Sequence, residues 1–202
     1  MITKADKVAH LEEIFRDSIS VKQRVLDSHL NSIVEMADVV VRSLKAGGKL
    51  MLCGNGGSAA DAQHLAAELL VRLRPQINRP GIAALSLATD TSSLTACGND
   101  YSYEDYFERQ VRALGRPGDV LIGITTSGKS ANIIRALAAA REMKIATLGF
   151  LGDDGGPALS KCDLAFVVPS AITGRIQESH ITAGHGLMEL IEDMLVDEPV
   201  KT

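Results

Sequence analysis

Several features that define particular protein classes are missing from this chain of 202 residues. Its three cysteines, Cys53, Cys97 and Cys162, lie far apart and form no C-x-x-C pair, so the sequence predicts neither a disulfide framework nor a thiolate zinc site. No apolar run approaches the roughly 20 residues of a membrane span, and the first residues lack the apolar centre of a signal peptide. A net charge of -4 without a basic stripe argues against a nucleic-acid surface. We therefore expect a cytoplasmic globular protein that binds neither membrane nor nucleic acid.

The first part of the sequence is nearly free of glycine and proline. Residues 5–46 place apolar side chains at helical spacing, for example Leu11, Ile14 and Phe15, and so predict two helices or one bent helix. We expect residues 1–46 to form an N-terminal helical arm. The arm could bury its apolar stripe against another subunit or, equally, against its own domain.

From residue 47 to residue 202, short apolar runs alternate with helical stretches. Most of the runs are apolar on both faces, as buried parallel strands are. The alternation predicts a single α/β domain with a five-stranded parallel sheet flanked by helices on both faces, doubly wound and flavodoxin-like. Ligands of such sheets bind beyond the carboxyl ends of the strands. The predicted strands cover about residues 49–53, 82–87, 119–125, 144–150 and 164–169, and the predicted helices about 58–73, 90–97, 103–114, 130–143 and 174–197.

Two loops that follow predicted strands have the composition of phosphate sites. The first is "GNGGSA" at residues 54–59, where glycines let backbone N–H groups approach an anion at a helix start. The second is "TTSGKSAN" at residues 125–132, which places four hydroxyl groups around one glycine. Either loop alone could equally be an ordinary capped turn. Neither has the Walker spacing, so a phosphate monoester suits them better than a nucleoside triphosphate.

A histidine and a glutamate lie four residues apart on the helix after the first loop. His64 and Glu68 therefore share a helix face, which by itself would more often be a simple surface contact. The last predicted helix adds Gln177, His180 and His185 in an apolar setting. Because Gln177 and His185 are about 12 Å apart along a straight helix, they converge only on a point between them or through two subunits. We therefore expect the site to lie near a subunit interface.

The combination of "CGNGGSAADAQHLAAELLVRL", "TACGND", "GDVLIGITTSGKSANIIRAL" and "RIQESHITAGHGLMELIE" resembles the phosphoheptose isomerases, which have the sugar isomerase (SIS) fold. The resemblance covers about residues 45–195. It implies the interconversion of sedoheptulose 7-phosphate and D-glycero-D-manno-heptose 7-phosphate, the first step toward the heptose of lipopolysaccharide. It also implies a cytoplasmic homotetramer with active sites at subunit interfaces and one zinc ion per subunit.

Residue by residue, the resemblance implies a zinc site formed by His64, Glu68, Gln177 and His185. Glu68 and His185 correspond to the acid–base pair of the family. The implied substrate contacts also include Glu68 and Gln177, the phosphate-loop residues Thr125, Thr126, Ser127 and Ser130, and the further positions Asn55, Gly56, Gly57, Ser58, Arg72, Asn99 and Asp100.

Three positions depart from the family pattern. Thr125 and Lys129 stand where serine and asparagine are common, and Gly174 stands where relatives often have an aspartate that helps to open the sugar ring. Glu178 or His180 could take over that role.

The implied chemistry moves a proton between C1 and C2 through an enediol. Glu68 would remove the carbon-bound proton, His185 would exchange protons with the oxygens, and zinc would polarise the carbonyl. Two alternatives stay open: a non-catalytic SIS-fold protein that binds a sugar phosphate or a protein partner for regulation, and an isomerase for another phosphosugar.

Overall fold

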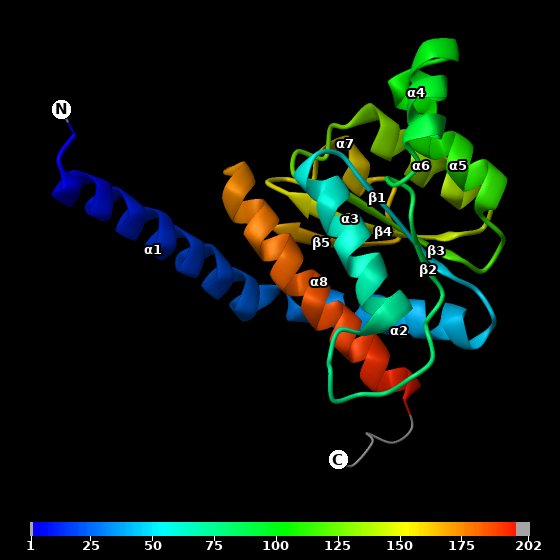
Figure 1. Cartoon of the computed structure of the whole chain (residues 1–202), viewed down its shortest axis with the longest axis horizontal. Helices are drawn as coiled ribbons and strands as arrows, with labels where there is room; N and C mark the ends of the chain where they lie inside the picture. The colour runs from blue at the N-terminus through cyan, green and yellow to red at the C-terminus, as the bar shows by residue number, and fades with distance from the viewer. Residues whose placement is uncertain (1, 197–202) are drawn as a thin grey trace.

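The computed structural model describes residues 2–196. At its centre lies a five-stranded sheet in the order β2-β1-β3-β4-β5, with every neighbouring pair parallel (Figure 1). This is the predicted flavodoxin-like order, in which the chain first moves to one edge and then to the other. The strands are β1 (Leu50–Gly54), β2 (Ala84–Ser86), β3 (Val120–Thr125), β4 (Ala146–Gly152) and β5 (Leu164–Val168).

The central strands are buried on both faces because successive side chains point to opposite sides of a sheet. Leu50 and Leu52 of β1 join one apolar core, whereas Met51 and Cys53 join the other. Both faces therefore need a layer of helices. Helices α2 (Leu30–Lys45), α3 (Gly57–Ala67) and α8 (Thr173–Leu195) contribute to the first core, and α4 (Thr91–Asp100), α5 (Tyr106–Leu114), α6 (Ala131–Glu142) and α7 (Gly156–Leu159) to the second.

Helix α1 (Lys4–Ser28) extends away from the rest of the molecule (Figure 1). Its last turns are anchored where Val21 and Val25 enter the first core, and near its middle the Ile14 carbonyl accepts a hydrogen bond from the Arg175 guanidinium at 2.7 Å. The earlier turns expose an apolar stripe that includes Phe15 and Ile19, which are 68% and 66% exposed. Helix α2, by contrast, packs into the core through residues such as Met36 and Val40. The division at residues 46 and 47 stays a prediction.

The predicted strands and long helices are confirmed to within a few residues, and two local differences stand out. The helix predicted over 58–73 changes at its end into a π-helical turn, η1 (Glu68–Arg72), and the predicted helix over 103–114 begins with a 3-10 turn, η2 (Tyr103–Asp105). The short helix α7 was not predicted, because four residues carry too little periodicity to be recognised. Residue 197, in the last predicted helix, lies outside the described residues.

Candidate active site

Two helices that are distant in sequence bring the predicted histidines together. Helices α3 and α8 lie side by side, so closely that a Cβ at Gly184 would come within 2.7 Å of Leu65 Cδ1. Across this contact His64 Nε2 lies 2.8 Å from His185 Nε2, and on α3 it lies 3.2 Å from Glu68 Oε1. One ligand atom from each of the three residues falls within 4.8 Å of the others. The structure thus joins the beginning and the end of the α/β domain at one point.

The three side chains have the donor set and spacing of a metal site. Zinc binds histidine nitrogen and carboxylate oxygen at about 2.0–2.2 Å, so its ligand atoms lie roughly 3–3.5 Å from one another. The 2.8 and 3.2 Å separations in this cluster are close to that range. Glu68 is 16% exposed at its side chain and His64 is 47% exposed, so an ion could enter from solvent. The cluster therefore fits a zinc ion with one or more coordination positions left for other ligands.

Asp61 is a member of this neighbourhood that the sequence analysis missed. It lies three residues before His64 on the same side of α3, and that spacing was the signal available in the sequence. Its Oδ2 is buried and accepts no hydrogen bond from the residues that the structure describes. Burial raises the pKa of the Asp61 carboxyl, while the charges of His64 and His185 act in the opposite direction.

The loop after β3 forms a compact hydroxyl-lined turn before α6. Thr125 Oγ1 lies 3.1 Å from Ser130 Oγ, and Ser127 Oγ accepts a hydrogen bond from the Lys129 N–H at 3.2 Å. Gly128 has a φ of +63°, and a Cβ there would lie 2.0 Å from the Gly155 carbonyl oxygen, so only glycine fits the turn. Thr126 is half-buried, and Ser127 and Lys129 are exposed. Three of the four predicted phosphate contacts, Thr126, Ser127 and Ser130, thus stay accessible, and the fourth, Thr125, is buried beside Ser130.

The two phosphate-type loops are joined by a pair of amides. Asn55, in the first loop, and Asn132, at the start of α6, exchange two side-chain hydrogen bonds of 2.9 Å each. The Tyr103 hydroxyl donates a third to Asn55 Oδ1 at 2.6 Å. Asn132 and Tyr103 were not singled out from the sequence, since nothing in their spacing indicates this contact. The amide pair fixes the loops relative to each other at the carboxyl ends of β1 and β3.

Gln177 lies at the other end of the contact between α3 and α8. A Cβ at Gly57 would come within 2.5 Å of Gln177 Nε2, so the amide rests on the start of α3. Gly57 precedes His64 by seven residues, about 10 Å along a helix. The adjoining Gly56 is exposed and Ser58 is buried. The substrate contacts of these residues and the metal role of Gln177 stay predictions.

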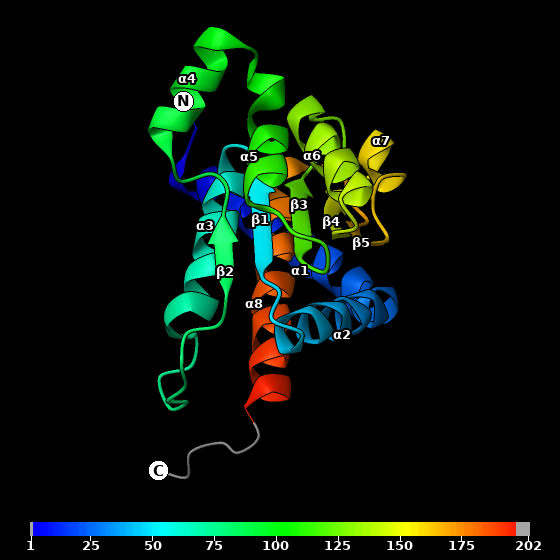
Figure 2. The same cartoon turned by 90° about the vertical axis from the view of Figure 1, so that its right-hand side faces the viewer.

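The other predicted substrate residues are exposed. Asn99 and Asp100 are exposed at the end of α4, where Asn99 Nδ2 donates to Asp100 Oδ1, and α4 extends beyond the carboxyl ends of the strands (Figure 2). Arg72 is also exposed, and its guanidinium donates to the Pro75 carbonyl at 3.0 Å. Their predicted contacts with substrate would require a ligand that reaches them or a second subunit.

The structure separates the two residues considered as replacements for the missing aspartate. His180 is 1% exposed and its Nε2–H donates to the Leu151 carbonyl oxygen, which argues against its predicted role in ring opening. Glu178 accepts a hydrogen bond from the Arg175 guanidinium. A Cβ at Gly174 would meet nothing within 4 Å, so an aspartate would fit there.

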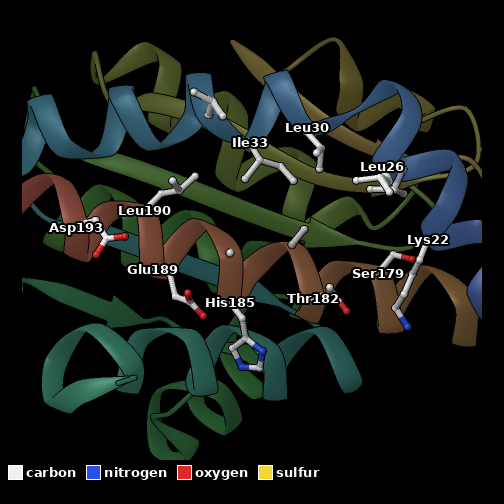
Figure 3. A pocket seen from close by; sticks show the side chains of 14 residues that line it. Lys22, Leu26, Leu30, Ile33, Ser179, Thr182, His185, Glu189, Leu190 and Asp193 are labelled. Atoms are coloured by element: carbon white, nitrogen blue, oxygen red, sulfur yellow. The ribbon is translucent and has the colours of Figure 1, made fainter. Parts of the chain in front are cut away.

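His185 also borders an apolar groove. The groove runs between α8 and the junction of α1 with α2, and Figure 3 shows the His185 ring at its edge. Its walls include the exposed side chains of Leu26 and Leu30 on one side and Leu190 on the other. The cluster and the groove thus share one residue.

Comparison with known proteins places the chain in a family. The SIS domain family matches residues 13–152. Phosphoheptose isomerase of Roseiflexus sp. (strain RS-1) is 54% identical over 181 residues, which cover 90% of this chain and 91% of the relative. Phosphoheptose isomerase of Paramagnetospirillum magneticum is 58% identical over 157 residues, covering 78% and 81%.

A solved structure agrees with these relatives. Phosphoheptose isomerase from Neisseria gonorrhoeae superposes with a TM-score of 0.86 at 43% identity, covering 95% of this chain and all of the other. The chain therefore belongs to the phosphoheptose isomerase family, whose members are enzymes of the isomerase class.

Proposed function

We propose that this enzyme interconverts sedoheptulose 7-phosphate and D-glycero-D-manno-heptose 7-phosphate through an enediol, the first step of ADP-heptose synthesis for lipopolysaccharide. Family membership supports the reaction class. The observation that carries the assignment of residues is the convergence of His64, Glu68 and His185 where α3 meets α8. A carboxylate and two imidazoles at one point provide groups that accept and donate protons near neutral pH.

Glu68 and His185 divide the proton transfers between them. The Glu68 carboxylate removes the proton from the carbon next to the carbonyl and returns it to the neighbouring carbon. His185 donates a proton to the carbonyl oxygen as the enediol forms and removes one from the other oxygen as it decays. His64, 2.8 Å from the His185 ring, orients that ring.

We assign one zinc ion per subunit to His64, Glu68 and His185. The predicted fourth ligand, Gln177, rests on Gly57 in the same chain, so in this assignment it would come from a neighbouring subunit. When bound, zinc supplies Lewis-acid polarisation of the substrate carbonyl. Glu68 and His185 are both ligands and proposed acid–base groups in this assignment, so with zinc bound the proton transfers would fall to the second carboxylate oxygen of Glu68 and the other ring nitrogen of His185.

The phosphate-type loops position the substrate from its other end. A heptose 7-phosphate carries its phosphate at the opposite end of the carbon chain from C1 and C2. The first loop lies at the start of α3, roughly 10 Å along that helix from His64. Hydroxyl and backbone N–H donors of Thr126, Ser127 and Ser130 bind the phosphate, and the loop at 54–59 contacts the sugar. The binding energy of the phosphate holds C1 and C2 at the cluster.

The proposed assembly is a cytoplasmic homotetramer whose active sites lie at subunit interfaces. The exposed apolar stripe of α1 and the apolar groove next to His185 support this, because isolated soluble chains rarely leave such surfaces uncovered. No helix within residues 2–196 has the length and hydropathy to cross a membrane. Light scattering of the purified protein would measure the subunit number.

The reaction is tested by incubating the protein with sedoheptulose 7-phosphate and following the aldose product by NMR, with and without a chelator. We expect product with zinc and a large loss of rate after chelation. Absence of the aldose under every metal condition would favour a non-catalytic SIS-fold protein that binds a sugar phosphate or a protein partner. Turnover of another phosphosugar, but not of sedoheptulose 7-phosphate, would favour an isomerase for that other sugar. Glu68→Gln should abolish turnover and leave phosphate-ester binding largely intact.

A further inference from the structure

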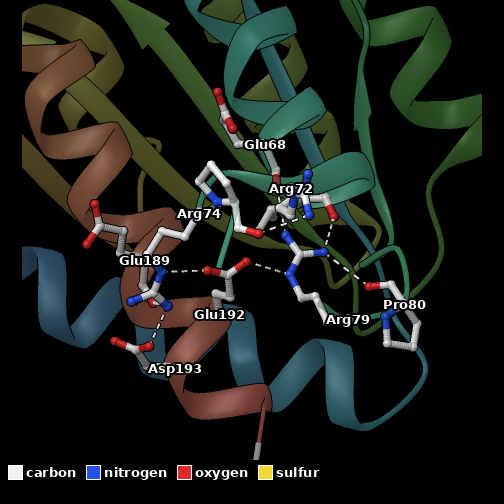
Figure 4. Close-up of polar contacts among 10 residues, drawn as sticks. Glu68, Arg72, Arg74, Arg79, Pro80, Glu189, Glu192 and Asp193 are labelled. Carbon is white, nitrogen blue, oxygen red and sulfur yellow. Dashed lines mark hydrogen bonds and ion pairs between the residues drawn. The ribbon is translucent and has the colours of Figure 1, made fainter. Parts of the chain in front are cut away.

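A buried network of ion pairs lies next to Glu68 (Figure 4). At its centre is Glu192 of α8, which is 1% exposed. Its two carboxylate oxygens accept from the Nε–H groups of Arg79 and Arg74, each at 2.6 Å. Arg74 also pairs with Asp193 near the surface. A buried charge of this kind is stable only when all its partners are present.

Arg79 differs from Arg74 in what else it contacts. Its two remaining guanidinium nitrogens donate to the carbonyl oxygens of Glu68 and Leu69, both at 2.8 Å. The backbone N–H of Ile82 donates to the same Leu69 carbonyl at 3.0 Å. One planar guanidinium thus joins a carboxylate on α8 to two successive backbone carbonyls. The side chain of Arg79 is only 3% exposed, so these bonds are shielded from water.

Those two carbonyls belong to the first residues of the π-helical turn Glu68–Arg72. A π-helical turn is an uncommon departure from α-helical geometry that recurs at functional sites. In this chain the π-helical turn begins at Glu68, directly after the last residue of α3. The residue at which α3 changes into the π-helical turn therefore sets the direction of the Glu68 side chain. The Arg79 guanidinium and the Ile82 N–H favour the change from α-helix to π-helical turn, because they donate hydrogen bonds to the Glu68 and Leu69 carbonyls where that change occurs.

The same contacts link Glu68 to the helix that carries His185. Glu192 follows His185 by seven residues, two turns along the same side of α8. Arg79 therefore ties the main chain of Glu68 to a fixed point on α8, while His64 and Glu68 face His185 two turns away.

We propose that Arg79 is a positioning residue of the isomerase: held by Glu192, its guanidinium fixes the π-helical turn and so sets the Glu68 carboxylate relative to His64 and His185. The inference rests on the proposed role of Glu68. Arg79 contacts no reacting atom and acts only through the backbone.

The test compares Arg79→Lys with Arg74→Lys in the full chain. Lysine keeps a positive charge opposite Glu192, but its ammonium lacks the fork that reaches two carbonyls and a carboxylate together. For Arg79→Lys we expect kcat to fall about 10- to 100-fold with KM within about threefold, because a small misplacement of a catalytic group costs rate. Zinc affinity, measured by chelator competition without turnover, should fall about 10- to 100-fold. Arg74→Lys should change either quantity less than about threefold, since Arg74 makes no bond to the turn.

Circular dichroism and the melting temperature identify any variant that fails to fold. If Arg79→Lys does not fold, Arg79→Met combined with Glu192→Met removes both buried charges together and is measured in the same way. Equal behaviour of the Arg79 and Arg74 variants in both kcat and zinc affinity overturns the inference. Glu68→Gln, measured in parallel, distinguishes failure of the proposed function from failure of the inference about Arg79. If Glu68→Gln is active, Glu68 is not the base, and the positioning role of Arg79 is also wrong. If it is inactive while the lysine variants behave alike, only the inference fails.

Discussion

The side of α8 that faces the sheet and the side that faces α3 each carry a histidine, five residues apart. His180 is buried, its Nε2–H donates to the Leu151 carbonyl at 2.9 Å, and its ring packs near Phe150 and Phe166. Burial lowers the pKa of His180 to about 4, although the hydrogen bond to Leu151 acts to raise it. His185 is half-buried and faces His64 and Glu68. Helix geometry thus turns one histidine into a neutral core residue and leaves the other accessible for proton transfer.

The largest expected contrast is in turnover. His185→Gln should lower kcat about 10²- to 10⁴-fold, the usual contribution of an acid–base group, with little change in melting temperature. The matched variant His180→Gln should keep kcat within a few-fold in its folded fraction, because His180 contacts no part of the cluster. Steady-state kinetics by NMR measures both. A comparable kcat loss in the two variants would remove the functional distinction between the two sides of α8.

The next contrast is in the free energy of unfolding. His180→Ala should cost about 3 kcal/mol, because it opens a cavity beside Phe150 and leaves the Leu151 carbonyl without its donor. His185→Ala should cost less than about 1 kcal/mol, since its ring is at the surface of the fold. Urea unfolding at one fixed protein concentration gives both values. Equal costs would show that the packing around His180 contributes little.

Acid should weaken the fold through His180. The unfolded chain protonates this histidine near its ordinary pKa of 6.5, whereas the folded chain does so only at about 4. Between these values the unfolded state binds more protons, so stability falls as pH drops from above 6.5 toward 4. From pH 8 to pH 5 the loss is about 2 kcal/mol. His180→Phe should lose this part of the pH dependence, measured by urea unfolding at each pH, and an unchanged slope would contradict the assignment to His180.

The smallest expected effect concerns the contact that holds His185 against α3. A Cβ at Gly184 would lie 2.7 Å from Leu65 Cδ1, and Leu65 is buried, so Gly184→Ala must push the two helices apart. The strain exceeds the gain in helix propensity, and we expect a net loss of about 1 kcal/mol with a kcat loss of a few-fold. At Gly98 in α4 a Cβ meets nothing within 4 Å, so Gly98→Ala should stabilise by about 0.5 kcal/mol. Thermal unfolding distinguishes the two variants: the melting temperature should fall for Gly184→Ala and rise for Gly98→Ala. A rise in both would show that the Gly184 contact is not tight.

Much of the fold was predictable because its signals are local. Apolar runs of five to seven residues between helical stretches identify the strands, and the parallel order follows from their alternation. His64 and Glu68 were recognised as a pair because a spacing of four residues places them on one helix face. The hydroxyl-rich loop at 125–132 was recognised from its composition. Asp61 lies at an equally local spacing from His64 and was overlooked, although the same helix-face argument applies to it.

The sequence by itself determined which residues share a helix face and which runs become buried strands, because backbone geometry repeats every few residues. The resemblance implied that His185 joins His64, but only the tertiary structure showed how they meet, that Arg79 reaches the Glu68 carbonyl, and that Asn55 pairs with Asn132. These contacts join residues between 11 and 121 positions apart, and each depends on how helices pack around the sheet. Packing of that kind is set by the fit of many side chains together, which no single spacing in the chain records.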